Sequence, residues 1–377
     1  MIDDTFISGI QSSLKTIQGQ PGVAYTQNSP TFFELRYAKF NGTSWSVETV
    51  DGSSSDIGDS PSLLEVQGQP AIAYLDDTNN NLKYARFNGS TWDIQTVDSA
   101  SVSSPISMIL VQGRPAIAYG ASGLDLYYIR STDATGTNWG TRVEVVDSIL
   151  LLSASLSVIN GVPAIAYHDY STSVNNNNYV KSNDSLGNSW GSPEIVEDDT
   201  SSTTGHTISL IDVQGRPAIS YHRTSSGSLL RYARYNGSTW DIQTIADEGA
   251  SCGLPQSMNL IDNKPAIVYG VSLLSFSGWQ TRYIHSFDST GTSWGNSELI
   301  DGGSSTSASI ETTSLILYDG RASTTYYDRN SQELKFARRG EWSNISSSSS
   351  SSKDSSSSSS SKDSSSSSSK DSSSSSS

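Results

Sequence analysis

Short apolar runs alternate with turn-forming residues along most of the chain. Between Ser62 and Val97, four runs of β-forming composition are "SLLEV", "PAIAY", "LKYARF" and "TWDIQTV". Gln-Gly, Asp-Asp-Thr-Asn-Asn and Asn-Gly separate them. Asn-Gly between two such runs is a strong signal of a β-hairpin, and no stretch has a helical period with capping residues. The pattern therefore predicts four short antiparallel strands in this unit.

The same unit recurs seven times. Its most regular marks are a tyrosine after a "PAIA"-like run and a tryptophan near the end. The tyrosines are Tyr25, Tyr74, Tyr119, Tyr167, Tyr221, Tyr269 and Tyr326; the tryptophans are Trp45, Trp92, Trp139, Trp190, Trp240, Trp294 and Trp342. Copies two and five are nearly identical in "FNGSTWDIQTV" (87–97) and "YNGSTWDIQTI" (235–245). Seven units of four strands predict an all-β, seven-bladed β-propeller.

The "PAIAY" run is apolar at successive positions, so both of its faces are expected to be buried. A propeller blade is covered by a neighbour on each side, which accounts for such a strand. The repeated tyrosines and tryptophans are therefore predicted to pack between blades. A ladder of aromatic binding sites is the alternative interpretation.

The two ends of the chain differ in character. We expect residues 1–345 to form the propeller. Residues 346–377 contain serine broken by Lys-Asp pairs and bury no core, which predicts a disordered tail, linker or stalk. At the start, "MID" matches "TVD", the close of a fourth strand. Residues 1–3 are therefore expected to be a remnant of the edge of a preceding blade. The alternative is that residues 4–10 add to blade seven and close the ring.

Charge and cysteine content narrow the classes of partner. The net charge is −15, which opposes binding to nucleic acids or anionic membranes. A cationic partner or Ca²⁺ stays possible, although no motif supports Ca²⁺. No cofactor is expected. The sequence contains no run of 18 apolar residues, so membrane insertion is not expected. Cys252 is the one cysteine, so no intrachain disulfide is possible. The start lacks a signal-peptide pattern, although an extracellular or surface location is suspected.

Three copies replace Asn-Gly with a longer turn. These are "STDATGTNWG" (131–140), "SNDSLGNSWG" (182–191) and "SFDSTGTSWG" (286–295). They resemble the Asp-box, or bacterial neuraminidase repeat, Ser-x-Asp-x-Gly-x-Thr-Trp, with one extra residue between Asp and Gly. The whole unit is similar to bacterial repeat propellers with "GxPAIAY" units, most of them expected outside the cell. The resemblance implies the fold; propellers with such boxes include sialidases, other glycosidases and non-enzymes.

No catalytic set is recognisable in the sequence. A sialidase-like site needs three convergent arginines, a Tyr–Glu pair and an acid/base Asp, and the Arg-Ile-Pro motif of that family is absent. The histidines lack metal-binding spacing. We therefore expect a protein that is not an enzyme, and that binds a glycan or a protein or serves as a scaffold. The alternatives are a sialidase-like glycoside hydrolase and a structural subunit of a virion, filament or sheath.

If the protein binds a ligand, the loops after the second strands are the predicted location, because they vary most between units. Trp279, in the insertion "GVSLLSFSGWQT", is the expected aromatic anchor. The expected polar contacts are His168, Asp169, His222, Arg223, Asp76, Tyr327 and Asp328. A solvated loop rim is the alternative interpretation of these residues.

Overall fold

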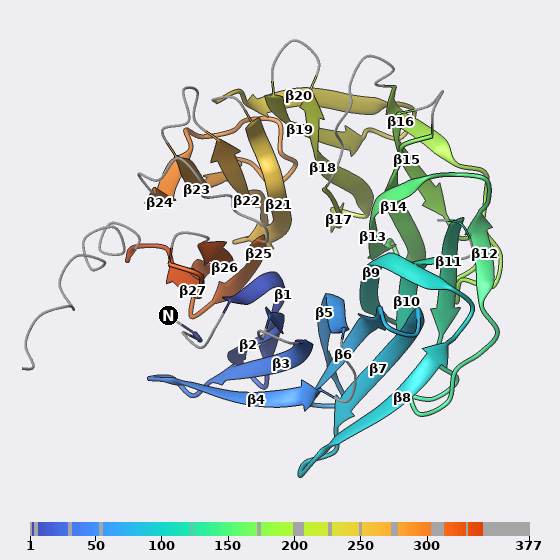
Figure 1. Cartoon of the computed structure of the whole chain (residues 1–377). Helices are drawn as coiled ribbons and strands as arrows, with labels where there is room; N and C mark the ends of the chain where they lie inside the picture. Colours follow the sequence, from blue (N-terminus) through green and yellow to red (C-terminus); the bar gives the residue numbers. More distant parts are fainter. Residues whose placement is uncertain are drawn as a thin grey trace, which may run out of the picture.

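Seven β-sheets stand around a central axis like the blades of a propeller (Figure 1). The computed structural model describes residues 2–3, 7–28, 32–52, 56–121, 123, 125–171, 175–198, 207–224, 228–248, 251–272, 278–302, 313–328 and 331–341. Trp342 and the serine-rich tail lie outside these residues. The prediction of a seven-bladed propeller of four-stranded antiparallel blades is confirmed.

Each blade runs outward from the axis in chain order. Blades one to three contain β1 (Ile7–Ile17), β2 (Gln20–Asn28), β3 (Phe33–Phe40), β4 (Trp45–Asp51), β5 (Ile57–Val66), β6 (Gln69–Asp76), β7 (Asn81–Phe87), β8 (Trp92–Asp98), β9 (Val102–Val111), β10 (Arg114–Ala121), β11 (Asp125–Arg130) and β12 (Val143–Val146). Blades four and five contain β13 (Leu151–Ile159), β14 (Val162–Asp169), β15 (Asn176–Lys181), β16 (Glu194–Asp198), β17 (Ile208–Val213), β18 (Arg216–Thr224), β19 (Ser228–Tyr235) and β20 (Trp240–Ala246). Blades six and seven contain β21 (Ser251–Ile261), β22 (Lys264–Ser272), β23 (Trp279–His285), β24 (Glu298–Gly302), β25 (Thr313–Tyr318), β26 (Arg321–Asp328) and β27 (Glu333–Arg338).

Two kinds of turn join the strands as the sequence predicts, but with different geometry. Gln67 and Gly68 both have positive φ (51° and 72°), so Gln-Gly forms the tight two-residue hairpin between β5 and β6. At Asn-Gly, only Gly89 has positive φ (108°). The Oδ1 of Asn88 accepts the backbone N–H groups of Ser90 and Thr91 at 3.0 Å, so the asparagine caps a four-residue turn.

The core is divided among the blade interfaces. Seven clusters of buried apolar residues each combine two neighbouring blades. Edge-on aromatic pairs extend six of these clusters outward, as between Tyr84 and Trp139 with ring centroids 5.3 Å apart. The others are Tyr37–Trp92, Tyr128–Trp190, Tyr179–Trp240, Tyr232–Trp294 and Phe336–Trp45. The prediction that these tryptophans pack between blades is confirmed for the described residues.

A ring of serines joins the innermost strands around the axis. The Oγ of Ser62 in β5 accepts the backbone N–H of Met108 in β9 at 2.9 Å. Ser13, Ser107, Ser155, Ser209 and Ser257 make the same contact with Leu63, Leu156, Leu210, Met258 and Leu315. The signal was present in the sequence as Ser-Leu or Ser-Met at one position of every unit, but sequence reasoning missed it.

The N-terminal residues close the ring on blade seven. The backbone N–H of Ile2 donates to the carbonyl of Leu334 in β27 at 3.0 Å, and Asp3 forms an antiparallel bridge with Leu334. Asp51 holds the corresponding position in blade one, opposite Leu35. The interpretation of "MID" as the end of a fourth strand is therefore confirmed for Ile2 and Asp3, while Met1 lies outside the described residues. The rival placement is wrong for residues 7–10, which belong to β1.

Candidate functional site

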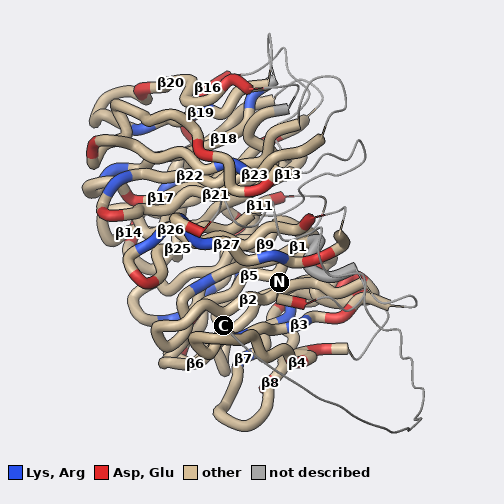
Figure 2. The backbone as a smooth tube through the Cα atoms, turned by 90° about the vertical axis from the view of Figure 1, so that its left-hand side faces the viewer, with Lys and Arg blue, Asp and Glu red and all other residues tan. Residues whose placement is uncertain are grey.

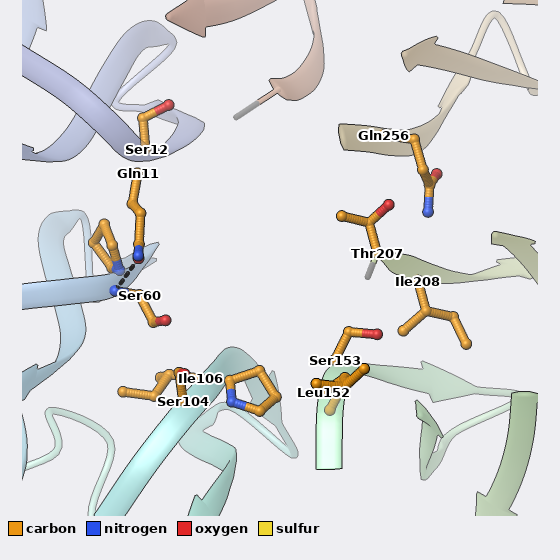
Figure 3. A pocket seen from close by; sticks show the side chains of 13 residues that line it. Gln11, Ser12, Ser60, Ser104, Ile106, Leu152, Ser153, Thr207, Ile208 and Gln256 are labelled. Carbon is orange, nitrogen blue, oxygen red and sulfur yellow. Dashed lines mark hydrogen bonds between the residues drawn. The ribbon is translucent and has the colours of Figure 1, made fainter. Parts of the chain in front are cut away.

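The first strands of the blades surround a cavity of about 360 Å³ at one mouth of the central channel (Figure 3). Because the strands are antiparallel, the starts of the first strands and the connections between second and third strands lie at this same end. The lining residues are Gln11, Ser12, Ser60, Pro61, Ser104, Pro105, Ile106, Leu152, Ser153, Ala154, Thr207, Ile208 and Gln256. Among the residues that the structure describes, this lining includes hydroxyl, amide and apolar groups and no Asp, Glu, Lys, Arg or His.

Neighbouring residues hold the two amide side chains of this lining in place. Gln256 accepts a hydrogen bond from the Oγ of Ser220 at 2.5 Å and donates one to the carbonyl of Ser220 at 2.9 Å. Gln11 accepts the backbone N–H of Ser60. A cavity of this size, with fixed amides, hydroxyls and proline rings, suits a neutral ligand that both donates and accepts hydrogen bonds.

None of the eight predicted site residues lines this cavity. His168, His222 and Tyr327 are 2%, 1% and 2% exposed, because the second strands continue past the repeated tyrosine into the blade interface. His168 shares a hydrogen bond of 3.1 Å with Asn177, and His222 one of 2.6 Å with Ser228. The expected placement in open loops is therefore wrong for these three residues. It is also wrong for Asp76, Asp169, Arg223 and Asp328, which lie within the second strands. His168 nevertheless pairs across the sheet with Ser153, which lines the cavity.

The predicted charged residues sit beside fixed partners. Arg223 forms an ion pair with Glu197 at 2.7 Å, and Asp328 forms one with Lys335. The carboxylate of Asp76 accepts hydrogen bonds from Asn79, and that of Asp169 accepts the backbone N–H groups of Leu150 and Ser171. Figure 2 shows acidic and basic positions interspersed along the strands, in keeping with such pairing.

Tyr221 and two arginines of blade five meet Glu197 of blade four, which gives part of the set that a sialidase site requires. Tyr221 donates to Glu197 at 2.6 Å, and Arg223 and Arg231 both pair with that carboxylate. Tyr221 is fully buried, and burial together with the Glu197 charge raises its pKa. The same tyrosine–carboxylate contact recurs as Tyr25–Asp3, Tyr74–Asp51, Tyr119–Asp98 and Tyr326–Asp301. The recurrence identifies it as a clamp between blades.

Trp279 opens β23 and is not a loop residue. Its backbone pairs with Ser272 at the end of β22, so the predicted insertion is shorter than expected. The side chain is half-buried. Leu273, Leu274 and Phe276, the apolar residues expected beside it, lie outside the described residues. The ligand-binding role of Trp279 stays a prediction.

An aspartate with an unusual pKa stands next to the cavity lining. Asp59 directly precedes Ser60 in β5, and burial raises its pKa to about 6, with the charge of Asp77 adding to the effect. Hydrogen bonds from Ser60 and Gln11 act in the opposite direction. A perturbed carboxyl beside a cavity is a candidate acid or base. Sequence reasoning missed it because Asp59 resembles other acidic turn residues.

Within the part of the chain that the structure describes, no group of three or more His, Cys, Asp or Glu side chains is placed to hold a metal ion. No described segment is a helix long and apolar enough to span a membrane.

Comparison with known proteins identifies a shared fold. No protein-family model and no curated protein matches the chain. A solved ulvan lyase of polysaccharide lyase family PL25 is 14% identical, covering 84% of this chain and 89% of its own, with a TM-score of 0.60. A mutant of AofleA from Arthrobotrys oligospora is 16% identical over 72% and 79%, with a TM-score of 0.49. The NanB sialidase from Streptococcus pneumoniae is 12% identical over 86% and 66%, with a TM-score of 0.46.

The expectation that this protein is not an enzyme is overturned by these likenesses. The solved propeller with the TM-score of 0.60 is a polysaccharide lyase. The fold therefore gives no argument against catalysis. At 12–16% identity, the likeness extends to the propeller architecture and not to individual side chains.

Proposed function

We propose that this protein is a glycan-acting propeller that works outside the cell and engages a neutral glycan at the channel mouth. The cavity of about 360 Å³ carries the proposal, because the part of its lining that the structure describes offers hydroxyl and amide groups and no charged side chain. Sugar hydroxyls donate and accept hydrogen bonds, and the lining offers both kinds of partner. Pro61 and Pro105 add apolar surface for a sugar ring.

A printed array of neutral and anionic glycans tests this proposal. We expect the wild-type protein to bind neutral glycans, and Thr207→Val and Gln256→Leu each to weaken that binding at least tenfold. Thr43→Val is the matched control, because Thr43 is exposed in the hairpin at the other end of blade one. Binding confined to sialylated or uronate glycans, or unchanged in both mouth variants, would refute the proposal.

Trp279 remains the proposed aromatic anchor for a longer glycan chain that leaves the mouth. It begins β23 at the end of the molecule where the cavity opens, and its side chain is half-buried rather than enclosed. Trp279→Ala should reduce binding of long glycans on the array and spare short ones. Equal loss for short and long glycans would show that the side chain acts on the fold instead.

Hydrolysis of the bound glycan is the second candidate function, and Asp59 favours it. A carboxyl group with a pKa of about 6 keeps its proton in mildly acidic solution and can there give it to the oxygen of a breaking glycosidic bond. Asp77, whose pKa is raised by burial and by Asp56, is the neighbouring carboxylate that would take the proton of the attacking water.

Release of reducing ends from the neutral glycans that bind on the array measures this activity. Asp59→Asn should abolish release while binding persists. An equal rate from the Asn variant would remove Asp59 from the mechanism.

We further propose that the three long turns are Asp-boxes. Each places a carboxylate over the backbone N–H groups of its own turn, as Asp288 does for Thr290 at 2.8 Å and Ser293 at 2.7 Å. Asp133 and Asp184 make the equivalent contacts. A carboxylate in this position fixes the turn that carries the repeated tryptophan.

A further inference from the structure

A second cavity, of about 480 Å³, lies between blades two and three. Its lining residues are Tyr84, Arg86, Asp93, Ile94, Gln95, Thr135, Gly136 and Thr137. They come from the end of β7, the start of β8 and the long turn after β11. Because third strands run away from the channel mouth, this groove lies toward the opposite end of the propeller.

One face of blade two supplies most of the groove. Tyr84 pairs across the sheet with Gln95, and Arg86 with Asp93, so all four side chains project from the same face. Tyr84 donates to the carbonyl of Thr135 at 2.9 Å, and Gln95 donates to that of Gly136.

The turn that faces this blade comes within van der Waals distance of Tyr84. A Cβ on Gly136 would stand 2.7 Å from the Tyr84 ring, and the residue has a φ of 81°. Only glycine meets both conditions. The groove therefore has rigid walls that belong to two blades.

The residues and contacts that form this groove recur between blades five and six. All eight positions carry the same residue types: Tyr232, Arg234, Asp241, Ile242, Gln243, Thr290, Gly291 and Thr292. The contacts repeat as well, since Tyr232 donates to the carbonyl of Thr290 at 2.8 Å and Gln243 to that of Gly291.

Copying of the unit accounts for the groove positions within the nearly identical stretches 87–97 and 235–245, but the two long turns have diverged. The two long turns differ at Thr132 and Phe287, Ala134 and Ser289, and Asn138 and Ser293. The three residues that line the groove are unchanged between them. The identity is thus kept where the two blades face the cavity.

Blade four offers an internal comparison. Its long turn presents Leu186, Gly187 and Asn188 to Tyr128 of blade three. Arg130 of blade three occupies the same register position as Arg86, and its Nε donates to Val111 as that of Arg86 does to Val66. This interface shares the packing but lacks the Thr-Gly-Thr turn. The contact of the arginine with the backbone carbonyl is therefore common to both interfaces, and the residues around the arginine differ between them.

The chemistry of the groove suits vicinal hydroxyl groups. Val66 holds the Nε of Arg86 at 3.2 Å, and Asn88 donates to the Oδ1 of Asp93 at 2.8 Å, so a guanidinium and a carboxylate are fixed side by side. A diol can accept from the first and donate to the second. The Asp93 charge opposes an anionic ligand.

We propose that these two grooves are equivalent binding sites for a neutral glycan, which make the propeller bivalent at the end opposite the channel mouth. Two sites on one rigid body raise affinity for a repetitive polysaccharide beyond that of either site. The proposal does not depend on the mouth, because the two grooves share no residue with it.

Calorimetric titration with the neutral oligosaccharide that binds best on the printed array tests the proposal. Arg86→Ala and Arg234→Ala should each remove one site per chain, and the double variant should remove two. On the array itself, each single variant should lose at least tenfold in apparent affinity, because avidity is lost. Arg130→Ala is the matched control and should change neither quantity.

Asp93→Asn and Asp241→Asn guard against misfolding, because Asp93 lies exposed and Asp241 at the same register position of blade five. They should remove the same sites. The proposal is overturned if the double arginine variant keeps the wild-type number of sites, if no neutral glycan binds, or if Arg130→Ala loses as much as Arg86→Ala. Loss of the mouth site through Gln256→Leu should leave both groove sites in place, which separates the two proposals.

Discussion

Replacing Asp3 with alanine should lower the free energy of unfolding by about 1–3 kcal/mol, because it leaves a buried hydroxyl without its acceptor. Asp3 accepts the Tyr25 hydroxyl at 2.6 Å, and the two residues are 7% and 0% exposed. Asp3→Asn keeps an acceptor and should cost less. The neighbouring Ile2 stays in place in both variants, so the measured loss belongs to the carboxylate.

Urea unfolding at neutral pH, followed by tryptophan fluorescence, measures these differences. Asp51→Ala is the internal reference, because Asp51 makes the same contact with Tyr74 at 2.7 Å and also pairs with Lys83 at 2.7 Å. We expect Asp51→Ala to be the most destabilising of the three variants and Asp3→Asn the least. If Asp3→Ala unfolds like the wild type while Asp51→Ala is destabilised, the N-terminal residues do not close the ring in solution.

Three further changes test other parts of the fold. Gly187→Ala should destabilise by about 1–3 kcal/mol in urea, because its Cβ would stand 2.3 Å from the Tyr128 ring at a φ of 84°; a neutral result would mean that the turn packs differently. Burial raises the folded-state pKa of Asp59 to about 6, so the free energy of unfolding should fall as pH rises from about 4 through 6. Asp59→Asn should therefore be about 1–3 kcal/mol more stable than the wild type near pH 7 but not near pH 4. Parallel pH profiles of the two proteins would contradict this. Burial acts to raise the pKa of Asp288, but hydrogen bonds from Thr290 and Thr292 outweigh it and lower the pKa. The loss of stability in Asp288→Ala should therefore be full at neutral pH and disappear as pH falls below about 4. A loss that persists in acid would assign the effect to packing.

The repeat made the architecture predictable. Tyr74 and Trp92 recur at fixed places in a unit whose runs and turns are long enough for four strands, and packing between blades is what such regular aromatics do. The end of the ring was readable too, because "MID" carries the buried isoleucine and the carboxylate of a fourth strand.

The site was less predictable, for two physical reasons. His168 follows a repeated tyrosine and was assigned to a loop, but β14 extends through Asp169 and buries the ring against blade five. Residues such as Ser60 and Thr207 look like ordinary polar strand positions. They form a cavity only after seven first strands have been brought around one axis, and no local pattern reports that closure.

A crystal structure with the best neutral oligosaccharide from the array tests the central claim most directly. The account predicts a sugar at the channel mouth, within hydrogen-bonding distance of Ser60, Thr207 or the Gln256 amide. A mouth that stays empty while sugar occupies other surfaces of the crystal would contradict it.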